Sequence, residues 1–323
     1  MTEVFILHSV EDSTINADIR WFLQTQLSEL AQRSQLTGWP SDEHVNLLCQ
    51  RAAGLFVYAV ATVKFLDHKA YSLQQRLNKI IELPEQTTYE GGTQFNTTTT
   101  TTLDSLYTSI LQMALDFGGE DPELDSNAQS IIGTVILALN PLPPPAIAEL
   151  VGLEAGLVMK ILTQVQSVLI LSEDPNCLVK PFHKSFPDFL MDPLRCPNKR
   201  FYISPGTLHH KLTINCLRLM NNTLKWNHLS LPDYALNLEV KDLQDRVKDC
   251  ISPGLKYACK SWCNHLTKTR EDVACILDPL HNFLKKKFLP WLDVISVLGA
   301  TGDAVVGLQN LILWLQEVCL CPL

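Results

Sequence analysis

The sequence lacks the marks of a secreted or membrane-spanning protein. Its first twenty residues contain no basic region followed by the long apolar stretch of a secretory signal peptide. The longest apolar runs, 52–61 and 131–139, are shorter than the roughly 20 residues that cross a bilayer. We therefore expect a cytoplasmic chain whose ten cysteines are thiols in a reducing compartment rather than disulfides.

The sequence also lacks the motifs of a self-contained enzyme. None of its fourteen glycines stands in the GxxxxGK-Ser/Thr spacing of a phosphate-binding loop, and G-x-S-x-G, H-E-x-x-H and paired-cysteine zinc patterns are absent. The densest group of possible metal ligands is Cys250, Cys259, Cys263 and Cys275 with His265, of which Cys259 and Cys263 share a helix face. We interpret these cysteines as small buried apolar residues. No catalytic residue, no metal site and no cofactor are expected for the chain in isolation.

Positive charge is scarce, with a formal net charge of -8. Long-range attraction to phosphate backbones or anionic membranes is therefore not expected. The one basic triplet, Lys285 to Lys287, is interpreted as a solvated helix face rather than a membrane patch. Neither nucleic acid nor a membrane is expected as a partner.

What the sequence does contain is enough apolar residue, 46%, to fold a chain of 323 residues around a core. Apolar spacing of three and four residues predicts an N-terminal helical segment, 1–83. Its expected helices are 12–33, 41–66 and 73–81. A segment rich in glycine and threonine, 84–102, follows and is predicted to be a linker.

The next segment, 103–195, has the element order of a winged helix. Helical spacing at 103–117, 126–139, 146–150 and 154–166 precedes two extended runs, 168–171 and 177–182, that are joined by a turn. The remainder, 196–323, is expected to be helical. The predicted fold class is therefore mainly α, with a helical N-terminal segment, a winged-helix domain with a small β-hairpin, and a helical C-terminal region.

Several phrases, in order along nearly the whole chain, resemble the basidiomycete NACHT proteins, which are nod-like receptor relatives within the STAND class of NTPases. Five of these phrases are EDSTINADIRWFL, LCQRAAGLFVYAVATVKFL, GTVILALNPLPPPAIAELVGL, FHKSFPDFLMDPLRC and WLDVISVLGATGDAV. Members of that family carry a P-loop and a Walker B strand before the first phrase, and this sequence is expected to begin after both.

The resemblance implies roles for two residues. Gly54 stands in the family's G-L-P type motif, which packs against the nucleotide base, with Phe56 in place of the proline. His183 stands at the histidine of the M-H-D type motif, which is thought to contact the β-phosphate of ADP and hold the inactive state; Lys184 replaces the aspartate. Both roles require a nucleotide core, and ATP or ADP with Mg²⁺ enters only with it.

The leading hypothesis is thus a non-catalytic regulatory part of a NACHT/STAND signalling ATPase, acting as lid, nucleotide-state sensor and intramolecular scaffold. Its expected partners are other proteins, or the core and repeat domains of that family. A stand-alone helical adaptor for protein partners is the alternative. A DNA-binding winged helix is less favoured, because its recognition helix, 154–166, holds a single cation, Lys160.

Overall fold

The computed structural model of the chain describes residues 12–68, 72–82, 97–115, 121–172, 174, 176–232, 237–269 and 274–320. Within these ranges the protein is mainly helical, and the only paired strands are β1 (Leu169–Ile170) and β2 (Lys180–Pro181). The predicted fold class, mainly α with a small hairpin, is confirmed.

The chain divides into two compact units. Unit 1 comprises 1–120, 164–169 and 182–201, and unit 2 comprises 121–163, 170–181 and 202–323. Residues 103–195, the segment expected to be a winged helix, contribute to both units.

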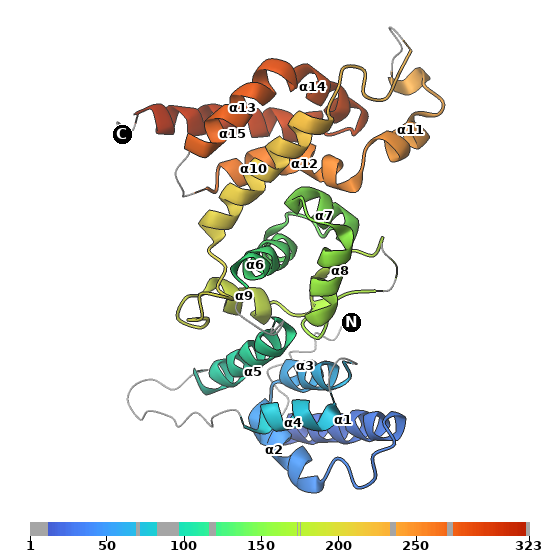
Figure 1. Ribbon diagram of the computed structural model, residues 1–323, viewed down its shortest axis with the longest axis vertical. Helices are drawn as coiled ribbons and strands as arrows, with labels where there is room; N and C mark the ends of the chain where they lie inside the picture. Colours follow the sequence, from blue (N-terminus) through green and yellow to red (C-terminus); the bar gives the residue numbers. More distant parts are fainter. Residues whose placement is uncertain are drawn as a thin grey trace, which may run out of the picture. The chain divides into compact units, whose positions relative to one another are not determined.

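The described residues of unit 1 form six helices, which are labelled in Figure 1. They are α1 (Asp12–Arg33), α2 (Asp42–Ala52), α3 (Phe56–Leu66), α4 (Leu73–Ile81), α5 (Thr97–Leu115) and α9 (Ser185–Met191). Helix α1 buries Ile19, Leu23 and Leu27, at the four-residue steps that the sequence predicted, and it packs on α2 and α3. The boundaries predicted for α1 and α4 are confirmed.

The prediction of one continuous helix over 41–66 is wrong. Ser41 does begin it, since its hydroxyl accepts from the His44 N–H at 3.2 Å. However, Ala53 and Gly54 have φ of 45° and 80°, in the left-handed region, and the chain turns there before α3 begins. The apolar pattern of the sequence continues across this break and therefore conceals it. The break itself can form because glycine adopts positive φ with little strain.

The predicted linker also needs a correction at its end. Helix α5 begins at Thr97, inside the range 84–102, and it includes the six-threonine run. Threonine disfavours a helix by only about 0.7 kcal/mol per residue, so a strongly apolar helix such as 103–115 can extend through it. The rest of the predicted linker lies outside the described residues.

Unit 2 contains the remaining helices. They are α6 (Pro122–Leu137), α7 (Pro144–Val151), α8 (Ala155–Gln164, but for its last residue), α10 (Pro205–Thr223), α11 (Leu243–Cys250), α12 (Pro253–Leu266), α13 (Ala274–Lys286), α14 (Phe288–Val297), α15 (Thr301–Leu320) and the short 3-10 helix η2 (Asn237–Glu239).

Helices α10 and α12 lie side by side at the centre of unit 2, with α7 and α13 against them (Figure 1). The rings of Trp262, Phe283 and Trp291 pack edge to face, with centroids 5.0 to 6.1 Å apart. The Trp291 indole N–H donates to the Cys259 carbonyl at 2.9 Å, which satisfies the buried polar end of the ring. This aromatic cluster ties α12, α13 and α14 together.

Candidate functional site

His183 lies exposed at the start of α9, in unit 1. The backbone N–H of Ser185 donates to its Nδ1 at 3.2 Å, and the Ser185 hydroxyl lies 2.8 Å from the same atom. Since an N–H can only donate, Nδ1 holds a lone pair, and the proton of the neutral ring must be on Nε2. The ring is therefore held by its inner nitrogen and presents an N–H donor at its outer one.

The support for His183 comes from α5. The Tyr107 hydroxyl lies 2.7 Å from the Ser185 hydroxyl, and the Tyr107 ring packs on Phe186 and Phe189 of α9. Burial raises the pKa of Tyr107 to about 12, with the Ser185 hydrogen bond acting in the opposite direction. A neutral, buried tyrosine thus fixes the serine that orients the exposed histidine.

An ion pair secures the other end of this segment. Arg195 meets the Asp104 carboxylate with both Nε and Nη2, at 3.0 and 2.7 Å. Burial raises the pKa of Asp104, and the hydrogen bond from Arg195 opposes that rise. Because the contact is bidentate and largely sheltered, it restrains the orientation of the segment that follows α9 relative to α5.

Gly54 occupies the turn between α2 and α3, and a Cβ built there would meet no atom within 4 Å. There is therefore room for a side chain at this position, but the φ of 80° favours glycine, since other residues rarely adopt it. Both predicted sensing residues, Gly54 and His183, belong to unit 1.

Beside this turn, α1 and α2 form a groove with a volume of about 580 Å³. It is lined by Asn16 and Arg20 on α1 and by Asn46 and Gln50 on α2, and Ala53, next to Gly54, also lines it. This groove is not among the sites predicted from the sequence. Its signal was present in the four-residue spacing of both polar pairs, which places each pair on one helix face.

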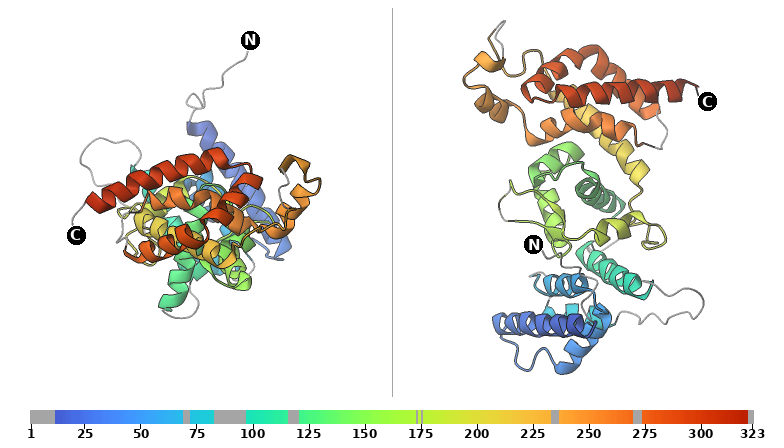
Figure 2. Two further views of the ribbon diagram at one scale, coloured as in Figure 1. Left: turned by 90° about the horizontal axis from the view of Figure 1, so that it is seen from above. Right: turned by 180° about the vertical axis from the view of Figure 1, so that it is seen from behind.

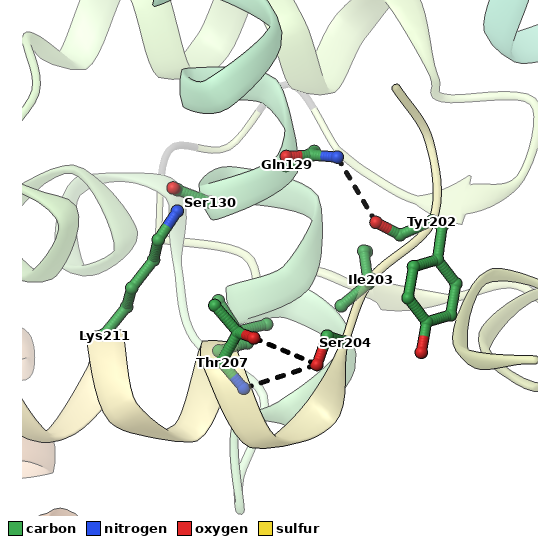
Figure 3. A pocket seen from close by; sticks show the side chains of 8 residues that line it. Gln129, Ser130, Tyr202, Ile203, Ser204, Thr207 and Lys211 are labelled. Atoms are coloured by element: carbon green, nitrogen blue, oxygen red, sulfur yellow. Dashed lines mark hydrogen bonds between the residues drawn. The ribbon is translucent and has the colours of Figure 1, made fainter. Parts of the chain in front are cut away.

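A second, smaller pocket lies in unit 2 at the start of α10 (Figure 3). Its volume is about 130 Å³, below the roughly 300 Å³ of typical small-molecule sites. The Thr207 N–H and hydroxyl both bond the Ser204 hydroxyl, and Lys211 points toward Ser130. The dimensions suit an ion or a few waters.

The cysteine cluster considered as a metal site is dispersed. Cys259 and Cys263 are buried in α12, as interpreted from the sequence. Cys250 and Cys275 are exposed, so the interpretation as buried residues is wrong for these two. Burial raises the pKa of both α12 thiols, so they stay protonated. Within the described residues no group of three or more His, Cys, Asp or Glu side chains is arranged to hold a metal ion.

His265 instead belongs to a buried polar chain in unit 2. Its Nδ1 lies 2.8 Å from Nδ1 of His209, and its Nε2 lies 2.7 Å from the Tyr257 hydroxyl, to which the Leu139 N–H also donates at 3.2 Å. Burial, together with the nearby His209 and Lys268, lowers the pKa of His265 to about 3. Both rings are held neutral, and one proton lies between them.

On the helix that would read DNA, α8, the exposed side includes Ala155, Gly156 and Lys160. A single cation supplies little phosphate contact, and neither of the other two reads a base. Among the described helices, none is both long and apolar enough to cross a membrane.

Comparison with known proteins adds no assignment: no family model, no curated protein and no solved structure matches this chain.

Proposed function

We propose that this protein is a non-catalytic regulatory module of a NACHT/STAND-type signalling ATPase, which acts in the cytoplasm as a lid and nucleotide-state sensor. The observation that carries the proposal is His183: an exposed imidazole with a fixed tautomer, oriented through Ser185 by buried Tyr107. A donor N–H presented in this way suits a phosphate oxygen of a nucleotide that a separate core binds.

The proposed mechanism needs no bond-breaking group. A sensor biases a two-state equilibrium only by contacting one state better than the other. One charge-assisted hydrogen bond from His183 to a phosphate would contribute about 1.5 to 3 kcal/mol, a shift of roughly ten- to a hundredfold in favour of the ADP-bound state. Hydrolysis would be the work of the core.

Calorimetry with ADP and Mg²⁺, together with an ATP hydrolysis assay on the whole chain, tests this proposal. We expect negligible hydrolysis and no tight stoichiometric binding, because one or two sensing contacts do not make a phosphate site. Tight one-to-one binding would overturn the proposal. At millimolar ADP, NMR of histidine-labelled protein should show the His183 signal shift while that of exposed His281 on α13 does not.

A second candidate function is a helical adaptor for protein partners, and α15 favours it. Val305, Val306, Ile312 and Leu313 on this helix are 56 to 58% exposed. Helix α15 lies at the outside of its bundle (Figure 2) and packs on α12 and α14 with its other face. Apolar side chains grouped along one helix face are typical of helix-mediated contacts. A stable monomer or dimer by light scattering is expected, and aggregation would count against the adaptor.

A further inference from the structure

A groove with an unusual composition lies in unit 2, where α10 ends and where α13 passes into α14. Its volume is about 430 Å³. Each of its described lining residues is either apolar or a lysine, and none carries a carboxylate. The lysines are Lys225, Lys285, Lys286 and Lys287. On a chain with a net charge of -8, four cations at one groove form a local reversal of sign.

Part of this cluster has a structural role. Lys287 donates from Nζ to the Leu224 carbonyl at 2.5 Å, which ties the α13–α14 turn to the end of α10. Lys285 and Lys286 stand in the last turn of α13, where positive charge complements the helix dipole. Neither role accounts for the exposed apolar side chains that accompany the lysines.

Those apolar side chains are large. Trp226 is 73% exposed and Leu289 is 58% exposed, and both line the groove together with Leu284, which is 38% exposed. In the sequence the three lysines of the triplet are consistent with a solvated helix face. The tertiary structure adds Leu224, Lys225 and Trp226, from about 60 residues earlier in the chain, to the same groove.

We propose that this groove binds the surface of an anionic phospholipid membrane, with lipid phosphates against Lys225, Lys285 and Lys286, and with Trp226 and Leu289 entering the headgroup boundary. Tryptophan prefers this boundary because its ring is apolar and its N–H is polar. Lysine clusters gain attraction from anionic headgroups, and apolar insertion supplies the second signal that stable surface binding requires.

The composition favours lipid over the other anionic partners. Protein interfaces are enriched in arginine and tyrosine and depleted in lysine, whereas the four cations of this groove are all lysines. Base reading in nucleic acid relies on arginine, asparagine or glutamine, and the described lining has none of these. Lysine acts as a point charge that accepts phosphates in many orientations, as a fluid lipid surface presents them.

Co-sedimentation of the whole chain with lipid vesicles tests the proposal. We expect binding to vesicles of phosphatidylcholine with phosphatidylserine, weakened by salt, and little binding to phosphatidylcholine alone. Replacing Lys225, Lys285 and Lys286 by glutamine should weaken it about a hundredfold, at about fivefold for each lysine. Trp226→Ala should weaken it about tenfold or more.

Matched controls separate the groove from general charge and hydrophobicity. Lys241, Lys248 and Lys256 are exposed lysines elsewhere in unit 2, and their triple glutamine variant removes the same charge. Trp21 on α1 is 70% exposed and serves as the control for Trp226. Both control variants should bind the anionic vesicles as the wild type does.

Several results would overturn the proposal. These are no binding to anionic vesicles, equal loss of binding in the groove and control triple variants, or unchanged binding by Trp226→Ala. Inorganic phosphate, polyglutamate and a single-stranded oligonucleotide serve as competitors. Displacement by phosphate at equal phosphate concentration would assign the groove to a soluble anion, and preferential binding of either polymer would assign it to protein or nucleic acid.

Discussion

The buried ring of His265 allows a quantitative prediction about unit 2. The side chain has 0% exposure, and burial, with His209 and Lys268, lowers its pKa to about 3. A histidine in the unfolded chain titrates near 6.5. Between these two values the unfolded chain binds a proton that the folded chain does not. The contribution of the neutral His265 ring to the free energy of unfolding is therefore fully present above about pH 6.5. It is lost progressively as the pH falls from there toward 3.

The magnitude follows from proton linkage. One proton bound only by the unfolded state lowers the free energy of unfolding by about 1.4 kcal/mol for each pH unit. From pH 7 to pH 5, His265 alone should thus lower it by about 2 kcal/mol. Burial, followed by Lys268, also lowers the pKa of His209, so its contribution has the same sign.

Urea unfolding at pH 7 and pH 5, followed by tryptophan fluorescence, measures this effect in the wild type and in His265→Gln. The variant should be less stable at both values, because His209 and Tyr257 lose a buried hydrogen-bond partner. Its loss between the two pH values should nevertheless be smaller than that of the wild type by about 2 kcal/mol. His281→Gln, at an exposed position of α13, is the control and should behave as the wild type. Equal losses in the wild type and His265→Gln would refute a buried, neutral ring.

Three further substitutions probe unit 1 by denaturant unfolding. Gly54→Ala should lower the free energy of unfolding by about 1 to 2 kcal/mol, because of its left-handed backbone alone. The control is Gly302→Ala in α15, where a Cβ also meets open space but φ is not positive, and it should not destabilise the protein. Equal effects of the two substitutions would exclude backbone strain as the cause. Arg195→Met should lower the free energy of unfolding by about 3 kcal/mol, because it leaves the sheltered Asp104 carboxylate unpaired. Adding Asp104→Leu in a double-mutant cycle should restore part of that loss in the double variant. His183→Ala should change stability by less than about 0.5 kcal/mol, since the ring is exposed; a larger loss would indicate a structural role in place of a sensing one.

The sequence by itself determined the boundaries of α1 and α4, the buried face of α1 and the place of the small hairpin. The periodicity of α1 and α4 was sufficient because the apolar face of a helix is encoded within a few turns. The extended runs 168–171 and 177–182, which contain β1 and β2, were found from their strand-like composition and the turn between them. The break at Ala53 and Gly54 escaped because an apolar run continues on both sides of it, and the start of α5 escaped because propensity is a weak guide next to a strongly apolar helix.

Only the tertiary structure decided what the functional candidates can do. His183 was noted by its position in a motif, but its tautomer depends on Ser185, which Tyr107 fixes from 78 residues away. The sequence made His265 a possible metal ligand. In the folded core it is hydrogen-bonded to His209, which stands 56 residues earlier in the chain. The lysine triplet is a candidate lipid-binding site only because Trp226 lines the same groove in the folded structure. Such contacts form when segments far apart in the sequence pack together. Local periodicity does not predict which distant segment will pack against a given residue.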